Sequence, residues 1–367
     1  MALRPASRPN ERRRRAREEP QLSDHGLASK WRDRGSYFSW AAQQPETTPV
    51  EIFHVERGDD TAQVLLLVHG FPTSSIDWFA VTDLLEDRLR VCTLDFPGYG
   101  FSDKPKGWGY SLGRDAELLD FYVRDVVGAE SLLVMAHDRG SSVAVNYILA
   151  QRGRTGNGAA ARVKHLVLTN GNLYLPLSNL TEFQRRVLDP ATAPVMLDAL
   201  TPSLLAGGIG LTMFSPPRAA GDREVEALTE TFAHADGVSV LHETIQYLHE
   251  RAQHEHEWLE ALARTDIPTT LLWGANDTVS PPRVANYIWH EFFMMKPGNN
   301  RFYLLPEANH YLQVDRPHGV AAAFLHTVDD SSSPSPGPIS GEPGAALLID
   351  CSRPRLPAST DVLASSE

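Results

Sequence analysis

The chain has 367 residues, of which 42% are hydrophobic, so it can build one large domain or two modest ones around a sizeable core. Acidic residues outnumber basic ones by 46 to 34, and the formal net charge is −12. Nucleic acids and anionic membranes repel such an acidic surface, so we expect neither of them as a main partner.

Three features of the sequence bear on the cellular location of the protein. Two cysteines, Cys92 and Cys351, make no disulfide framework, which fits a reducing compartment. The longest apolar run, "VLLLV" at 64–68, is far shorter than a membrane span. The Arg-rich start of the chain lacks the apolar stretch of a secretory signal and contains glutamates, which organelle-targeting peptides avoid. We therefore expect a cytoplasmic protein, either a monomer or a homodimer.

The first part of the chain predicts a tail followed by alternating strands and helices. Residues 1–34 are charged and have no apolar periodicity, which indicates a disordered basic tail. Amphipathic helical segments then alternate with apolar strands, a rhythm typical of a parallel sheet covered on both faces. The expected strands here are "VEIFHV" (50–55), "QVLLLVH" (63–69), "RVCTLDF" (90–96), "SLLVMAH" (131–137) and "VKHLVLTN" (163–170).

The rhythm breaks once and then resumes. Residues 171–258 show only helical and Pro/Gly segments, whereas strand patterns return at 268–277 and 301–309. We therefore predict a core of residues 35–170 and 259–327, interrupted by a helical cap at 171–258. Ligands of open α/β sheets bind at the carboxyl ends of the strands, where a cap would exclude water. Residues 328–367 are Ser/Pro/Gly-rich, which predicts a disordered tail.

Three polar residues stand at the ends of apolar strands: Asp138, Asp277 and His310. Their order along the chain is that of the nucleophile, acid and histidine of the α/β-hydrolase triad. The sharp turn that carries such a nucleophile needs small residues two positions before and after it, and Ala136 and Gly140 meet that need. The alternative is that Asp138 only caps the helix that follows it.

Two backbone groups near this turn could stabilise a developing negative charge. "HGFP" (69–72) follows the second of the listed strands, so the N–H of Phe71 can point at an oxyanion. The N–H of Arg139, directly after Asp138, is the expected second donor. Asp95 also ends a strand, but Asp277 fits the position of the triad acid better.

Five motifs together resemble the α/β-hydrolase group that contains epoxide hydrolases and haloalkane dehalogenases, and within it most resemble mesoderm-specific-transcript-like proteins. The motifs are "HGFPTSSIDW", "LDFPGYGFSDKP", "HDRG", "WGANDTVSP" and "NHYLQVDRP". The resemblance implies an α/β-hydrolase fold, with a mostly parallel eight-stranded sheet, helices on both faces and a helical cap. It implies no cofactor.

An aspartate at the nucleophile position indicates attack on saturated carbon. A serine there would give a stable ether, whereas a carboxylate gives an ester that water, activated by His310, can cleave. The expected partners are therefore a small apolar electrophile and water. Opening of an epoxide to a diol is the leading interpretation; removal of a halide, and a binding protein without catalysis that kept the fold, are the alternatives.

The leaving group separates these reactions. The resemblance places halide donors after the nucleophile and after "HG", but here Arg139 and Phe71 occupy those positions, and Ser142 replaces a carboxylate-binding arginine of fluoroacetate dehalogenases. For an epoxide, the resemblance implies tyrosine donors in the cap, and the candidates are Tyr247 and Tyr174. Several cap histidines follow helical spacing, which we interpret as a solvated helix face, so we expect no metal site.

Overall fold

The structure, a computed structural model, describes residues 25–42, 48–152, 161–329, 337–341 and 344–352. Its centre is a ten-stranded sheet in the order β1-β2-β4-β3-β5-β6-β7-β8-β10-β9. The strands from β4 through β3 to β8 run parallel to one another, and β1, β2, β9 and β10 add antiparallel edges. The strands are β1 (Gly35–Trp40), β2 (Val50–Arg57), β3 (Val64–Val68), β4 (Arg90–Leu94), β5 (Ser131–His137), β6 (Arg162–Thr169), β7 (Thr269–Gly274), β8 (Arg301–Leu305), β9 (Gly337–Pro338) and β10 (Leu347–Cys351).

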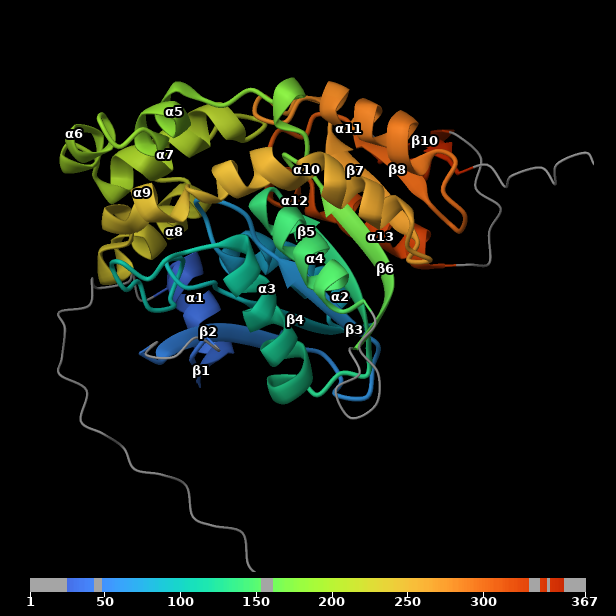
Figure 1. Cartoon of the computed structure of the whole chain (residues 1–367), viewed down its shortest axis with the longest axis horizontal. Helices are drawn as coiled ribbons and strands as arrows, with labels where there is room; N and C mark the ends of the chain where they lie inside the picture. The colour runs from blue at the N-terminus through green and yellow to red at the C-terminus, as the bar shows by residue number, and fades with distance from the viewer. Residues whose placement is uncertain (1–24, 43–47, 153–160, 330–336, 342–343, 353–367) are drawn as a thin grey trace, which may run out of the picture.

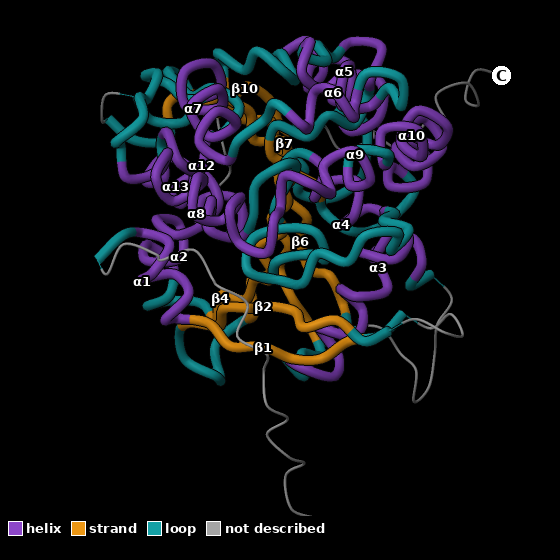
Figure 2. Tube along the Cα trace, turned by 90° about the vertical axis from the view of Figure 1, so that its left-hand side faces the viewer, coloured by secondary structure: helices purple, strands orange, loops and turns teal. Residues whose placement is uncertain are grey.

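Helices cover both faces of the sheet, as expected from the alternating pattern (Figure 2). The sequence of β3 is continuously apolar because its residues alternate between the two faces of the sheet and all five are buried. Leu65 and Leu67 pack toward α2 (Phe79–Leu85) and α13 (Pro317–Val328). Leu66 packs in the other layer, with residues of α3 (Leu112–Phe121), α4 (Arg139–Ala150) and α11 (Pro282–Ile288). The predicted α/β fold with two helical layers is therefore confirmed.

The segment between β6 and β7 forms a helical cap at one end of the molecule (Figure 1). Its helices are α5 (Glu182–Leu188), α6 (Ala193–Asp198), α7 (Pro202–Met213), α8 (Arg223–Ala233), α9 (Leu241–Thr244) and α10 (Tyr247–Ala263). The boundary expected at residue 258 falls inside α10, which starts in the cap and packs against α4 of the core as one continuous helix. No helix among the described residues is long and apolar enough to cross a membrane.

The N-terminal prediction needs a correction, because Leu27–Arg34 forms the helix α1. Ala28 and Trp31, three residues apart on one helical face, are fully buried. The Trp31 indole N–H donates to Ser75 Oγ at 3.0 Å, and α1 also contacts α8 of the cap. One apolar helical turn was too short to stand out in a charged sequence. The rest of the predicted tail, 1–24, lies outside the described residues.

The C-terminal prediction is also wrong in part. Strand β10 pairs antiparallel with β8, and Leu348 is buried under α13. The Trp289 indole N–H donates to Asp350 at 3.0 Å and ties the strand to the core. The sheet therefore has two strands beyond the eight expected, because a short apolar strand was hidden in Ser/Pro/Gly-rich surroundings. Residues 330–336, 342–343 and 353–367 of that predicted tail lie outside the described residues. A short helix, α12 (Leu312–Asp315), precedes α13.

Candidate active site

Asp138 lies at the turn between β5 and α4, with a backbone φ of 48°. With ψ at −118°, the residue lies outside the left-handed helical region, in a strained conformation that the tight turn imposes. The turn is tight because α4 starts directly against the end of β3. A Cβ on Gly140 would lie 2.5 Å from the His69 carbonyl oxygen and 2.7 Å from that of Val68. The small residue predicted at position 140 is therefore required by a backbone contact.

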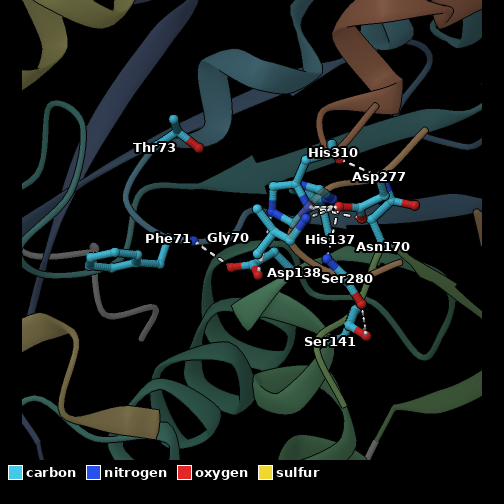
Figure 3. Close-up of polar contacts among 12 residues, drawn as sticks. Gly70, Phe71, Thr73, His137, Asp138, Ser141, Asn170, Asp277, Ser280 and His310 are labelled. Atoms are coloured by element: carbon cyan, nitrogen blue, oxygen red, sulfur yellow. Dashed lines mark hydrogen bonds and ion pairs between the residues drawn. The ribbon is translucent and has the colours of Figure 1, made fainter. Parts of the chain in front are cut away.

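The structure brings Asp138, Asp277 and His310 together (Figure 3). The Phe71 N–H donates to Oδ1 of Asp138 at 3.0 Å. His310 Nε2 lies 3.6 Å from Oδ2 of the same carboxylate, and His310 Nδ1 lies 3.0 Å from Oδ2 of Asp277. All three side chains are buried. Phe71, predicted as an oxyanion donor, thus binds the oxygen of the aspartate itself.

Backbone groups and one asparagine hold the acid and the histidine in place. Oδ1 of Asp277 accepts from the N–H groups of Val279 and Ser280, both at 2.8 Å. Asn170, at the end of β6, donates to the His310 carbonyl at 2.7 Å and accepts from the Gly274 N–H at 2.7 Å. Asn170 was not predicted. The signal in the sequence was its position at the polar end of the expected strand 163–170. Its positive φ of 42° is one that asparagine adopts more often than most residues.

His310 and the two aspartates stabilise one another's charged forms. Burial disfavours the charged imidazolium, but the carboxylates of Asp277 and Asp138 outweigh it and raise the pKa of His310 to about 10. Burial also opposes ionisation of Asp138, yet the hydrogen bond and charge of His310 hold the pKa of that carboxyl below its usual range. Burial lowers the pKa of the neighbouring His137 to about 3, so this histidine is neutral. Asp138 is therefore an anion facing a cationic His310.

Asp95 does not take the place of Asp277. Its carboxylate accepts from the N–H groups of Ser75 and Phe101 at 2.8 and 2.7 Å, and so ties two loops together. The preference for Asp277 as the partner of His310 agrees with this geometry.

The Arg139 side chain lies inside the protein and not on its surface. It is buried and forms an ion pair with Asp115 of α3. Its guanidinium carbon also lies over the rings of Tyr99 and Tyr247, at 5.2 and 5.3 Å from their centroids. The Arg139 backbone N–H begins α4, where amides have no partner within the helix, and its role as an oxyanion donor stays a prediction.

Tyr247 and Tyr174, the two predicted cap tyrosines, lie in different places. Tyr247 starts α10, is buried, and its ring centroid lies 5.9 Å from that of Phe71. Its hydroxyl has no hydrogen-bond partner among the described residues. Burial raises the pKa of Tyr247 well above 10, so the hydroxyl keeps its proton. Tyr247 is thus a protonated tyrosine whose ring lies beside the Phe71 ring and which is within electrostatic reach of Asp138.

Tyr174 does not join this cluster, and its prediction as a leaving-group donor is not supported by its position. It follows β6 in the loop before the cap, where its ring stacks on Tyr287 of α11 with centroids 4.3 Å apart. The aromatic partner on α11 explains this placement, because offset stacking stabilises exposed ring faces.

A narrow cavity opens beside His310. Its walls are mainly apolar and come from the Phe71 loop, from α5 and α7 of the cap, and from Val279. The free volume is about 20 Å³, room for roughly one water molecule. A substrate must therefore displace side chains of α7, among them Leu205, Ile209 and Met213.

Sequence comparisons point to hydrolases. The hydrolase LipZ of Mycobacterium tuberculosis is 32% identical over 300 residues, which cover 82% of this chain and 97% of LipZ. The human mesoderm-specific transcript homolog protein is 27% identical over 83% of this chain and 88% of its own length. Haloalkane dehalogenase 2 of M. tuberculosis is 26% identical over 75% and 90% of the two chains.

Solved structures share the fold. Haloalkane dehalogenase DbeA from Bradyrhizobium elkani superposes with a TM-score of 0.64 at 21% identity, covering 81% of this chain and all of DbeA. A chain from a study of novel epoxide hydrolases in hot-environment metagenomes superposes with a TM-score of 0.60 at 19% identity, covering 80% and 99%. Residues 63–317 also match the family model described as alpha/beta hydrolase fold. The chain belongs to the α/β-hydrolase family.

Proposed function

We propose that this hydrolase uses Asp138 to attack a saturated carbon, and that it opens epoxides to diols. The observation that carries the proposal is the pair of contacts on one carboxylate. Oδ1 of Asp138 is held by the Phe71 N–H, which leaves Oδ2 as the attacking oxygen, beside His310. The mainly apolar lining of the cavity at His310 suits a small apolar electrophile, which enters once the lining side chains move apart.

In the first step, Oδ2 of Asp138 forms a bond to an epoxide carbon as the carbon–oxygen bond of the ring breaks. The Tyr247 hydroxyl gives its proton to the departing oxygen, and the product is a hydroxyalkyl ester of Asp138. This assignment rests on the unpaired, protonated hydroxyl of Tyr247 near Phe71. The tyrosinate that forms is stabilised by the nearby guanidinium of Arg139.

In the second step, water attacks Cγ of the ester while His310 takes one of its protons. The negative charge then develops on Oδ1, where the Phe71 N–H already points. Ester formation itself prepares His310, because it removes the Asp138 charge that helps to raise the histidine pKa. When the intermediate collapses, the departing diol oxygen takes a proton from His310, and the new carboxyl group passes its proton to His310, which restores the Asp138 carboxylate. The proton that His310 gives up to solvent before the water attack balances the one that Tyr247 takes back from solvent.

Dehalogenation is the second candidate, and the similarity to haloalkane dehalogenase 2 favours it. It requires N–H donors around a halide, but the position after the nucleophile holds Arg139, which pairs with Asp115 through Nη2, and Phe71 offers only a backbone N–H already bonded to Asp138. Epoxide opening therefore leads, because Tyr247 supplies the proton that an epoxide oxygen needs.

The experiment removes the base and traps the intermediate. We expect His310→Gln, incubated with panels of epoxides and haloalkanes, to show an ester on Asp138 by intact mass and peptide mapping. Asp138→Asn is the control and should neither form the adduct nor turn over substrate. No adduct with any alkylating substrate, together with an unchanged rate in Asp138→Asn, would contradict the mechanism. Halide release by the unmodified protein without any diol formation would favour dehalogenation.

A further inference from the structure

Arg251 is a buried cation that the proposed mechanism does not use. It lies on α10, one helical turn after Tyr247, and its side chain is fully buried. Its Nε donates to Ser142 Oγ at 3.0 Å, and its guanidinium carbon lies 4.9 Å from the Tyr247 ring centroid. The other two guanidinium nitrogens, Nη1 and Nη2, have no hydrogen-bond partner among the described residues.

A buried guanidinium with two unpaired nitrogens destabilises a protein unless an anion binds to it. A buried guanidinium loses its hydration, and buried charges in proteins are normally paired with an acid or a bound ion. No acid among the described residues forms a hydrogen bond with Arg251, although the charges of Glu255 and Asp138 interact with it. Asp115 is paired with Arg139, and Oε2 of Glu255, one turn further along α10, accepts from the Leu175 N–H at 2.8 Å. The N–H groups of Nη1 and Nη2 of Arg251 thus have no acceptor among the described residues.

The guanidinium that carries these donors lies within electrostatic reach of the nucleophile. Ser142, which binds Arg251, is one helical turn from Asp138, a rise of about 6 Å along α4. The positive charge of Arg251 also helps to lower the pKa of Asp138, which places the two groups within electrostatic reach. Arg139 also leaves its Nε and Nη1 without a partner among the described residues and faces the same Tyr247 ring. Two buried arginines therefore lie against the ring of the proposed proton donor.

We propose that Arg251 binds a carboxylate group of the substrate, so that the preferred substrates are short acids that carry the electrophilic carbon near the carboxylate. The inference rests on the proposed Asp138 chemistry and adds a carboxylate to the otherwise apolar electrophile. Nη1 and Nη2 of an arginine form a planar fork that matches the two oxygens of a carboxylate. The short distance from Ser142 to Asp138 limits the chain between the two ends of the substrate.

The test compares two epoxides of nearly equal shape that differ in charge, glycidate and its amide glycidamide. We expect kcat/KM to be higher for glycidate in the unmodified protein. Arg251→Gln should lower kcat/KM for glycidate about tenfold to a hundredfold, mostly through KM, and change glycidamide turnover by less than about threefold. Arg251→Lys should recover part of the loss. Arg264→Gln, which removes an exposed arginine at the end of the same helix, is the matched control and should behave like the unmodified protein.

A second measurement needs no variant at position 251 and therefore does not depend on its folding. Acetate should compete with glycidamide in the unmodified protein, whereas acetamide should not. The carboxylate site is overturned if glycidate and glycidamide are turned over equally, if Arg251→Gln lowers both rates alike, or if chloride inhibits as well as acetate does. In each of these cases the ester trapped on Asp138 from glycidamide still stands, so the proposed function survives. Absence of that ester from both compounds would overturn both.

Discussion

His310 lies between two carboxylates, and its charge sets how activity should depend on pH. Its pKa is raised to about 10 by Asp277 and Asp138, against burial. In the ester only Asp277 remains charged, so the histidine pKa falls and the rate should rise with pH as His310 loses its proton. We expect Asp277→Asn to shift this acid limb to lower pH, and to reduce kcat by roughly three to four orders of magnitude because the imidazole loses its orienting acceptor.

The measurement is a pH–kcat profile of both proteins, with His242→Gln as the control. His242 lies on α9 of the cap and bonds the Val187 carbonyl, so its replacement should leave the profile unchanged. A profile for Asp277→Asn with the acid limb at the same or a higher pH would contradict this account of His310.

Asp77 is a buried acid whose ionisation should cost stability. Burial raises its pKa from 3.8 to about 8, although the Thr73 hydroxyl donates to it. Because the folded-state pKa exceeds the unfolded one, the stability from this group is full below pH 3.8 and is lost as pH rises toward 8. Asp77→Asn should therefore raise the free energy of unfolding at pH 9 by a few kcal/mol, and much less at pH 4.

Urea unfolding of both proteins at the two pH values tests this, and Asp87→Asn, in the exposed turn after α2, is the control. An equal effect of Asp77→Asn at both values would show that ionisation is not the cause.

The sequence predicted three of the polar residues at strand ends, but it missed Asn170 at the end of β6 and the residues that depend on tertiary contacts. Asp138, Asp277 and His310 could be found because each follows an apolar run, and parallel strands deliver such residues to one edge. Arg251 stands in the polar stretch "YLHERAQHEHE", where nothing distinguishes a buried arginine from a solvated one. Tyr174 resembled a donor by residue type alone, whereas its stacking on Tyr287 depends on where α11 packs.

At the scale of elements, the approach of α4 to β3 decides whether the Asp138 turn can form. Gly140→Ala would force a Cβ to 2.5 Å from the His69 carbonyl oxygen, so α4 would have to move. We expect the free energy of unfolding to fall by about 1–3 kcal/mol, the usual cost of overpacking, and activity to fall because Asp138 moves with the helix. Chemical denaturation and turnover measure the two effects.

Gly113→Ala provides the matched control within the helical layer. Gly113 lies in α3, and a Cβ there would meet no atom within 4 Å. Alanine should be neutral or stabilise the helix by about 0.5–1 kcal/mol. Equal losses from the two substitutions would contradict the contact argued for Gly140.

Element boundaries were predictable only where the hydrophobic period changes. The sequence predicted β3 and β5, which are buried on both faces of the sheet. It also predicted the cap, where strand patterns are absent. The end of the cap was not predicted, because α10 keeps one helical period from Tyr247 to Ala263 while its neighbours change from cap to core. The strand β10 was hidden for a different reason, since its five residues gain their stability from β8 and not from their own pattern.

At the scale of the whole molecule, α1 joins the core to the cap. Trp31 is fully buried, packs on Phe79 with ring centroids 5.5 Å apart and bonds Ser75 in the loop that follows Phe71. Trp31→Ala should lower the free energy of unfolding by about 3–5 kcal/mol, because a large side chain leaves a cavity. It should also weaken turnover, since α1 contacts α8 of the cap.

Thermal unfolding and steady-state kinetics test this role, with Lys30→Ala on the exposed face of α1 as the control. A stable, fully active Trp31→Ala protein would show that α1 is dispensable for the cap.

The pairing of β10 with β8 has a consequence for solubility. Without β10, the outer row of N–H and C=O groups on β8 would become an open sheet edge, which other chains can pair with. In the intact protein β10 fills that edge, and the two-residue β9, which includes Pro338, partly shields β10 in turn. A protein ending at residue 336 should therefore self-associate as its concentration rises, and light scattering against the full chain would detect this. A clipped C-terminal segment would thus change how the protein behaves in a crowded solution before it changes any chemistry.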